Sequence, residues 1–312
     1  MYHQSAANDQ PVFDPVSGRP SGRCEVLARR LRESGALPAS GSLLDVGAGS
    51  GAMLAAFSDA CPGWRLFGLD LDNRKLAALR AIPRFEELFI VPPDQVRQQF
   101  DLVTLIHSLE HFQDPLPMLR KLRERLAPRG RLFVEVNNVE RMPFDLLVAD
   151  HLCHFDPASL AHLAARAGLG GEALNTDWIN KELSLVSIAV PGAAASEHGD
   201  PRAAMARTER DVAWLGRMLE HAREAACGGK FGIFGTSIAA TWLASGLGEA
   251  VEFFVDEDAA REGRNHLGRP ILTPAQAPKG AVIYLAFVPE VSGAISRRLG
   301  DLPVKFTGLL PA

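Results

Sequence analysis

The stretch from Ser42 to Gly51 constrains this chain more than any other, because a short apolar segment leads directly into an acid and three closely spaced glycines. It reads Ser-Leu-Leu-Asp-Val-Gly-Ala-Gly-Ser-Gly, with the acid at Asp45. Glycine lacks a Cβ atom and tolerates positive φ, so the backbone can turn tightly here and pass close to a ligand. The pattern predicts a buried strand, a glycine turn and then a helix.

A second acid follows at the spacing that a nucleoside site requires. The apolar segment Arg65-Leu-Phe-Gly-Leu ends in Asp70, which lies 19 residues after Gly51. An acid at the tip of the next strand, about 20 residues beyond a glycine turn, is suited to accept hydrogen bonds from two ribose hydroxyls. Together the two segments predict a site for an adenosine-containing cofactor.

Composition excludes several classes of protein. The chain has 312 residues, of which 47% are hydrophobic and 22% charged, and this is ordinary for a soluble protein of two domains. A net charge of −4 predicts no nucleic-acid partner and no membrane partner. The four cysteines are widely separated, which argues against a disulfide framework and a zinc module. The polar N-terminus lacks an apolar core, so we expect a cytoplasmic protein.

Apolar segments and helical patterns alternate along the first half of the chain. We expect strands at 42–46, 65–70, 86–91, 101–106, 131–136 and 183–190, and helices at 50–59, 73–80, 114–126 and 157–167. The segment Leu126-Ala-Pro-Arg-Gly is expected to end a helix and form a tight turn. This alternation predicts an α/β fold with a doubly wound, Rossmann-like sheet that is mainly parallel.

Composition changes divide the chain into four regions. Residues 1–36 are predicted to form an N-terminal arm, poorly ordered or acting as a lid up to residue 20, and a helix. Residues 37–190 form the cofactor-binding domain, 191–228 a linker and connecting helix, and 229–312 a smaller Rossmann-like α/β domain. The connecting helix could mediate a homodimer or brace the two lobes, and the sequence leaves this open.

The glycine turn alone does not identify the cofactor. Gly47-Ala-Gly-Ser-Gly-Ala satisfies the dinucleotide fingerprint, which would indicate an NAD(P)-dependent oxidoreductase. However, Asp45 lies two residues before the first glycine, where it would repel a pyrophosphate at the following helix N-terminus. An ammonium and a sulfonium would instead be attracted, so a sulfonium cofactor is favoured.

Several segments resemble class I S-adenosylmethionine-dependent methyltransferases. They are Leu-Leu-Asp45-Val-Gly-Ala-Gly, Gly68-Leu-Asp70, Phe100-Asp-Leu-Val, Ser108-Leu-Glu-His-Phe-Gln-Asp-Pro and Leu126-Ala-Pro-Arg-Gly. The resemblance implies S-adenosyl-L-methionine as the cofactor. It implies that Asp45, Gly47, Ala48, Gly49 and Gly51 hold the methionine moiety, that Asp70, with Leu71, binds the ribose, and that His107 and Ser108 line the floor near the sulfonium. Asp94 is the nearest candidate for reading the adenine.

A second cluster of polar residues indicates where a methyl acceptor would bind. Asp150, His151, His154 and Asp156 lie within seven residues. Because uncompensated buried charge is costly, we expect them to face a polar cleft, where histidine is the natural general base. Their spacing matches no zinc pattern, so no metal is predicted.

Three further residues are candidates for binding the acceptor. His111 could line the floor of the site or cap a helix, and Asn137 could orient the acceptor or turn the chain. His154 could contact the acceptor or make a structural hydrogen bond. The residue types alone do not decide between these roles.

The 143–156 region and the C-terminal domain together resemble the sugar C-methyltransferases of deoxysugar biosynthesis, without their N-terminal zinc-binding module. The resemblance implies a sugar or nucleotide-linked sugar as the small-molecule acceptor and His151 as the base, and we expect Asp150 to orient it. The chain departs from that family at Val148 and Ala149, and at Lys181 and Glu182 in place of Gly-Gly. A protein that binds the cofactor without transferring a methyl group is therefore a third interpretation.

Overall fold

The computed structural model describes residues 10–14, 19–175, 177–190, 201–258 and 260–309, and divides into two compact units. The first comprises residues up to 145 together with 149–200, and the second comprises 201–312 together with 146–148. The first ten residues of the expected linker, 191–200, lie outside the described residues.

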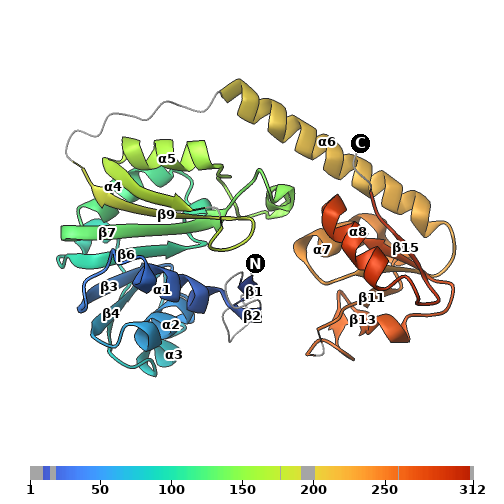
Figure 1. The fold of residues 1–312 in the computed structure, drawn as a ribbon, viewed down its shortest axis with the longest axis horizontal. Coiled ribbons are helices and arrows are strands. Elements are labelled where there is room, and N and C mark those ends of the chain that lie inside the picture. Colours follow the sequence, from blue (N-terminus) through green and yellow to red (C-terminus); the bar gives the residue numbers. More distant parts are fainter. Residues whose placement is uncertain (1–9, 15–18, 176, 191–200, 259, 310–312) are drawn as a thin grey trace. The chain divides into compact units, whose positions relative to one another are not determined.

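The first unit is built on a seven-stranded sheet (Figure 1). In spatial order its strands are β5 (Phe85–Phe89), β4 (Trp64–Leu69), β3 (Gly41–Val46), β6 (Phe100–Ile106), β7 (Leu126–Asn137), β9 (Glu182–Ala189) and β8 (Leu169–Asn175). Every neighbouring pair is parallel except those made by β9, which runs antiparallel to both β7 and β8. The predicted α/β, doubly wound, Rossmann-like fold is confirmed.

Helices cover both faces of this sheet because successive strand residues point to opposite sides. Leu43 and Leu102 contribute to one core, together with α1 (Arg23–Glu33), α2 (Ala52–Ala60) and α3 (Leu76–Arg80). Their neighbours Leu44 and Val103 contribute to the other core, together with α4 (Pro115–Arg123) and α5 (Pro157–Arg166). Burial on both faces explains why the strands read as continuous apolar runs.

One local prediction was wrong, and the predicted arm contains a hairpin that the sequence did not predict. Within the predicted arm, β1 (Pro11–Asp14) and β2 (Arg19–Gly22) pair in antiparallel fashion, while residues 1–9 and 15–18 lie outside the described residues. The segment starting at Leu126 is not a helix end, because α4 already stops at Arg123 and β7 begins at Leu126 beside Phe100. A register shift in this pairing accommodates the Pro-Arg-Gly residues inside the strand.

The second unit carries its own six-stranded sheet, with three helices. The strand order is β12 (Asn265–His266), β13 (Arg269–Leu272), β11 (Phe253–Val255), β10 (Phe231–Phe234), β14 (Val282–Leu285) and β15 (Lys305–Thr307), and only the β12–β13 pair is antiparallel. The helices are α6 (Pro201–Ala226), α7 (Ile238–Leu247) and α8 (Pro289–Arg298). The hydroxyl of Tyr284 on β14 donates to the carbonyl of Met218, which ties α6 to this sheet.

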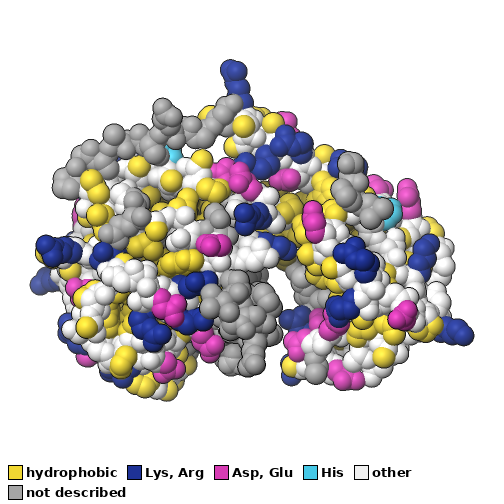
Figure 2. Space-filling view, viewed as in Figure 1, with side chains coloured by type: hydrophobic (Ala, Val, Ile, Leu, Met, Phe, Trp, Pro, Cys, Tyr) yellow, Lys and Arg dark blue, Asp and Glu magenta, His cyan; other side chains and the backbone are white. Residues whose placement is uncertain are grey.

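Acidic and basic side chains are interspersed over the visible face of each unit, as expected for a small net charge (Figure 2). Among the helices in the described part of the chain, none combines the length and apolar character needed to cross a lipid bilayer.

The start of α5 offers a test of the local structure next to the polar cluster. Asp156 accepts a hydrogen bond from the Ser159 amide at 2.7 Å, and the Ser159 hydroxyl lies 2.9 Å from the Asp156 amide. We expect Asp156→Ala to lower the free energy of unfolding by about 1 kcal/mol, because a helix N-cap is lost. Urea titration followed by circular dichroism would measure this, with Asp59→Ala on the exposed side of α2 as the control. Equal stabilities for the two variants would contradict the capping role.

Candidate functional site

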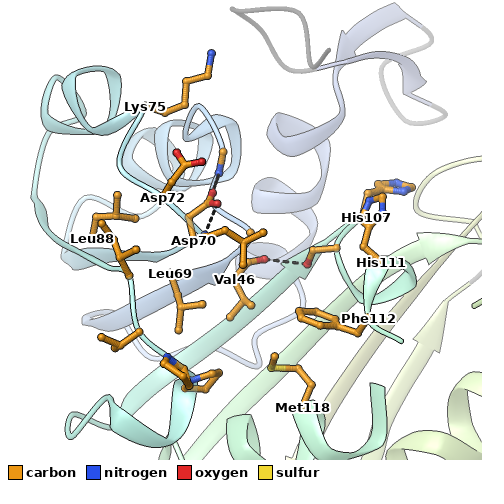
Figure 3. Close-up of a pocket in the computed structure, with 18 of the residues that line it drawn as sticks. Val46, Leu69, Asp70, Asp72, Lys75, Leu88, His107, His111, Phe112 and Met118 are labelled. Atoms are coloured by element: carbon orange, nitrogen blue, oxygen red, sulfur yellow. Dashed lines mark hydrogen bonds between the residues drawn. The ribbon is translucent and has the colours of Figure 1, made fainter. Parts of the chain in front are cut away.

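A cavity of about 1280 Å³ opens at the carboxyl ends of the central strands of the first unit (Figure 3). Ligands in open α/β sheets bind at this edge, where the strand order reverses. The predicted cofactor residues on its wall are Gly47, Gly49, Asp70, Leu71, His107 and Ser108. Further along, the wall is formed by His111, Phe112, Met118, Ala149, Asp150 and Leu152. The cavity therefore has room for a cofactor and an acceptor side by side.

The first position of the glycine turn requires glycine, because a side chain there would clash with Ser108. Gly47 has a φ of +79°, and a Cβ atom added there would lie 2.9 Å from the Cβ of Ser108. Ser108 is held in place by a hydrogen bond of 2.9 Å from its hydroxyl to the carbonyl of Val46. Backbone surface without side chains is what close approach of a ligand requires, so the turn fits an adenosine-containing cofactor.

Asp70 lies on the cavity wall at the end of β4. Its carboxylate accepts hydrogen bonds from the amide of Gly49 at 2.8 Å and from the amide of Leu71 at 2.6 Å. A carboxylate has about four lone-pair positions, so two such bonds leave capacity for the hydroxyls of a ribose. Asp70 thus both supports the glycine turn and presents acceptors to the cavity.

Three of the predicted cofactor residues lie behind this wall. Ala48 and Gly51 are buried, and Gly51 begins α2 with a φ of +86°. Asp45 is 3% exposed and accepts a hydrogen bond of 2.7 Å from the hydroxyl of Thr104. Burial, opposed by Thr104 and assisted by the charge of Asp70, raises the pKa of Asp45 to about 7. The predicted contact of Asp45 with the methionine moiety stays a prediction.

Asp94 does not reach the cavity wall. It lies in the short helical turn η1 (Pro93–Gln95), and its carboxylate pairs with the Lys121 ammonium at 3.0 Å. Pro92 and Pro93 line the wall instead. No acid follows β5 at the position predicted to read the adenine, and apolar contacts with Leu88 and Ile90 are available there.

A network of buried charged groups begins at His107, at the end of β6. This residue has a φ of +46°, a conformation that non-glycine residues rarely adopt. Its Nδ1 lies 3.1 Å from a carboxylate oxygen of Glu110, and its Nε2 lies 3.1 Å from Glu182. Glu182 also accepts a hydrogen bond of 2.7 Å from Arg23, at the start of α1. These contacts link four elements of the unit and offset the cost of the strained backbone.

Within this network of buried groups, the effect of burial on each pKa is opposed by charges of the opposite sign. Burial alone would raise the pKa of Glu182, but the positive charges of His107 and Arg23 lower it. Burial and then the charge of Arg23 would lower the pKa of His107, but Glu182 and Glu110 raise it. On β7, burial and the charge of Glu182 raise the pKa of Glu135 well above its usual value.

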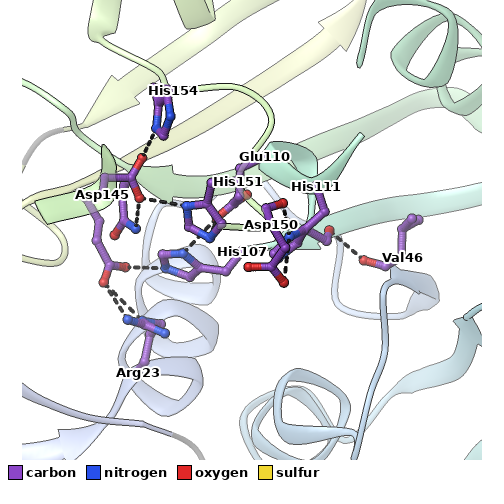
Figure 4. A network of polar contacts seen from close by, with 12 residues as sticks. Arg23, Val46, His107, Glu110, His111, Asp145, Asp150, His151 and His154 are labelled. Carbon is purple, nitrogen blue, oxygen red and sulfur yellow. Dashed lines mark hydrogen bonds and ion pairs between the residues drawn. The ribbon is translucent and has the colours of Figure 1, made fainter. Parts of the chain in front are cut away.

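A second polar cluster is centred on Asp145, in the short helical segment η3 (Pro143–Leu147) (Figure 4). One carboxylate oxygen lies 2.7 Å from Nδ1 of His151 and accepts from the amide of Asn137 at 2.7 Å. The other oxygen lies 2.6 Å from Nδ1 of His154. Because a carboxylate only accepts, both histidines donate through Nδ1, which leaves Nε2 of each available.

These bonds shift the pKa values of their members in opposite directions. Burial would raise the pKa of Asp145, but the hydrogen bonds from His151, His154 and Asn137 lower it strongly. Burial would lower the pKa of His151, but Asp145, Glu110 and Asp150 raise it. In this pair the carboxyl group therefore loses its proton more readily than usual, and the histidine holds its proton more tightly.

The predicted role of Asp150 is wrong: Asp145 orients His151. Asp150 instead accepts a hydrogen bond of 2.9 Å from Nδ1 of His111 through its main-chain carbonyl, and its carboxylate lies 3.6 Å from the same nitrogen. Asn137 and His154 both bind the Asp145 carboxylate, so they support the cluster from the side of β7 and of the loop before α5. Asp145 lies in the segment compared above with the sugar C-methyltransferases, but an acid six residues before a histidine gives no sign of the contact.

Two groups of side chains place candidate metal-ligand atoms within 4.8 Å of one another: His111 with Asp150 and His151, and Asp145 with His151 and His154. In the second group, short hydrogen bonds between the members explain the arrangement. The prediction that no metal is bound stays a prediction.

The comparisons with known proteins agree with this geometry. Residues 21–173 match the family model of a methyltransferase domain. The chain is 28% identical over 149 residues to the ubiquinone biosynthesis O-methyltransferase of Aeromonas salmonicida, an alignment that covers 41% of this chain and 62% of the relative. It is 30% identical over 151 residues to the protein of the same name from Xanthomonas axonopodis, covering 45% and 60%. The chain thus spans about three-fifths of these relatives.

Solved structures that are similar to this chain include two methyltransferases of antibiotic biosynthesis. The mitomycin 7-O-methyltransferase is 21% identical with a TM-score of 0.46, covering 54% of this chain and 53% of that one. A methyltransferase of calicheamicin biosynthesis in its S-adenosylhomocysteine-bound form is 22% identical with a TM-score of 0.42, covering 53% and 54%.

The matched segment and the cavity together define the class of this unit. Residues 21–173 form a class I S-adenosylmethionine-dependent methyltransferase domain, and its cofactor is S-adenosyl-L-methionine. The predicted cofactor and the predicted class of this domain are confirmed.

The contribution of Asp70 can be measured without knowing the acceptor. We expect Asp70→Ala to weaken the binding of S-adenosylhomocysteine by about 10- to 100-fold, because hydrogen bonds to a charged group are lost. Isothermal titration calorimetry would measure the dissociation constant, with Asp94→Ala as the matched control. Binding by Asp70→Ala that equals the wild type, or a comparable loss in Asp94→Ala, would show that the ribose acceptor has been misassigned.

Proposed function

We propose that this protein transfers a methyl group from S-adenosylmethionine to a hydroxyl of a small molecule, with His151 as the general base. The observation that carries the proposal is the 2.7 Å contact between Asp145 and Nδ1 of His151, beside the wall formed by His111 and Asp150. A carboxylate that fixes one ring nitrogen of a histidine leaves the other as a proton acceptor of defined tautomer.

The residues on the cavity wall would divide the work as follows. Gly47, Gly49 and Asp70 would hold the cofactor, which supplies an activated methyl group on a sulfonium when bound. His151 would take the acceptor proton on Nε2, and Asp145 would stabilise the imidazolium that forms. Displacement at a sulfonium needs little covalent assistance, so positioning of the acceptor would supply much of the rate enhancement.

The acceptor end of the wall combines apolar and polar groups. Phe112, Met118 and Leu152 lie there together with His111 and Asp150, which suits a molecule with an apolar face and a hydroxyl. We propose a sugar or nucleotide-linked sugar, as the resemblance to sugar C-methyltransferases implies. The relatives are named for ubiquinone biosynthesis, and their name supports oxygen as the methylated atom.

Two alternatives from the sequence make different predictions. An NAD(P)-dependent oxidoreductase is disfavoured by the match to a methyltransferase domain. A protein that binds the cofactor without using it would bind S-adenosylhomocysteine normally but label no acceptor.

Replacing the proposed base is the direct test. We expect His151→Ala to reduce methyl transfer by about 10²- to 10⁴-fold, because general-base assistance is lost. Transfer from methyl-labelled S-adenosylmethionine would be measured against nucleotide-linked sugars and against intermediates of ubiquinone biosynthesis, with and without EDTA. Binding of S-adenosylhomocysteine should be unchanged, since His151 is not among the cofactor residues.

His162→Ala on α5 is the matched control, and it should transfer methyl groups at the wild-type rate. Full activity in His151→Ala would exclude the proposed base. Sensitivity of the wild type to EDTA would instead indicate that a metal ion activates the acceptor.

The pH dependence should report the raised pKa of His151. The base must be neutral to accept a proton, so kcat/KM should rise with pH through a midpoint above the usual histidine value of about 6.5. Asp145→Asn removes the charge that stabilises the imidazolium, so this midpoint should move to lower pH while the maximal rate falls. An unchanged midpoint in Asp145→Asn would show that the titrating group is not His151.

A further inference from the structure

Glu110 connects two parts of the cavity wall: the part that carries the predicted cofactor residues (the cofactor wall) and the part that carries His111, Asp150 and Leu152 (the acceptor wall). Its side chain, in the short helical turn η2 (Leu109–His111), is 3% exposed. One carboxylate oxygen lies 3.1 Å from Nδ1 of His107, on the cofactor wall. The main-chain carbonyl of the same residue accepts hydrogen bonds from the amides of Leu152 and Cys153, at 2.8 and 3.2 Å, which fixes the acceptor wall.

The same carboxylate oxygen lies 4.0 Å from Nε2 of His151 (Figure 4). This separation is too long for a hydrogen bond, so Nε2 remains free to accept a proton. It is short enough for a strong attraction once His151 becomes positively charged, because both groups are buried and poorly screened by water. The second oxygen of Glu110 accepts no hydrogen bond from the described residues, which leaves this carboxylate with spare capacity for a cation.

We propose that Glu110 is a positioning residue for the methyl-transfer reaction: its carboxylate stabilises the imidazolium of His151 from the Nε2 side, opposite Asp145. The proposal rests on the proposed function for its catalytic meaning. His151 would then lie between two carboxylates, one hydrogen-bonded to Nδ1 and the other poised beside Nε2. His107 contacts the same carboxylate oxygen of Glu110 and competes with His151 for its charge.

Several charged groups act on His151 at once. Asp145 in η3 contacts Nδ1, Asp150 and His154 belong to the loop before α5, and the ring of His111 in η2 lies 5.0 Å away between centroids. Glu110 in turn faces His107, whose other nitrogen contacts Glu182 on β9, and Arg23 on α1 pairs with Glu182. The effect of Glu110 on the pKa of His151 must therefore be separated from the effects of these groups, by a substitution that removes the charge of Glu110 and leaves the other residues unchanged.

The test is the titration of His151 itself, which requires no acceptor and no activity. In the full-length chain with S-adenosylhomocysteine bound, nitrogen and carbon NMR shifts of the imidazole would be followed against pH, and the signal assigned by its loss in His151→Gln. We expect Glu110→Gln to lower the midpoint by about 1 to 3 pH units, because a negative charge beside Nε2 is removed. Glu124→Gln, an exposed glutamate of the same unit, should leave it unchanged.

A second variant predicts the opposite sign. His107→Asn removes the positively charged partner that competes for Glu110, so the midpoint of His151 should rise. Asparagine is chosen because it tolerates positive φ. If the substitutions merely disrupted the site, the midpoint of His151 would shift in the same direction in both variants, toward the usual histidine value.

Three outcomes overturn the proposal: no shift in a folded Glu110→Gln, equal shifts in Glu110→Gln and Glu124→Gln, or a downward shift in His107→Asn. If Glu110→Gln does not fold, His107→Asn decides the question alone. None of these results depends on methyl transfer, so failure of the proposed function would be detected separately by His151→Ala.

Discussion

Compensation of buried charge at one edge of the sheet is the constraint on which the rest of this site depends. The strands are apolar on both faces, so polar side chains collect where the strands end, and water is largely excluded there. Burial alone would raise the pKa values of Asp145 and Glu182, but hydrogen bonds and charges from histidines, Arg23 and Asn137 lower them. The partners come from α1, β7, the end of β6 and the loop before α5, so the charges also hold these segments together.

The same hydrogen bonds that compensate the buried charges also orient the histidine side chains. A buried carboxylate with several donors orients those donors tightly, and in His151 the orientation fixes which nitrogen can accept a proton. His107, whose backbone has a φ of +46°, contacts both Glu110 and Glu182 through its ring. Hydrogen bonds through Glu110 thereby link His107, beside the cofactor residues, to Leu152 and Cys153 at the other end of the cavity.

Much of the fold could be predicted because its signals are local. Local residues determine where the strands end, where the glycine turn lies and where the N-cap at Asp156 forms. The position of Asp70 at the end of the second strand was predicted from its spacing along a βαβ unit. The error at Leu126 arose because the pairing partner is distant in sequence: β7 extends through a Pro-Arg-Gly segment because Phe100 lies beside it. The local hairpin of β1 and β2 was not predicted because each strand has only four residues. Neither pairing leaves a periodic trace in the sequence.

The amino-acid sequence was sufficient for the class of domain and the cofactor, since the glycine turn and its acids are read along the chain, and it singled out His151 as a candidate base. Only tertiary structure assigned the partners of that histidine: the acid next to it, Asp150, contacts His111, while Asp145 and Glu110 approach its two nitrogens. The physical reason is that charge compensation acts through space at a few ångströms, where residues far apart in sequence compete equally with neighbours.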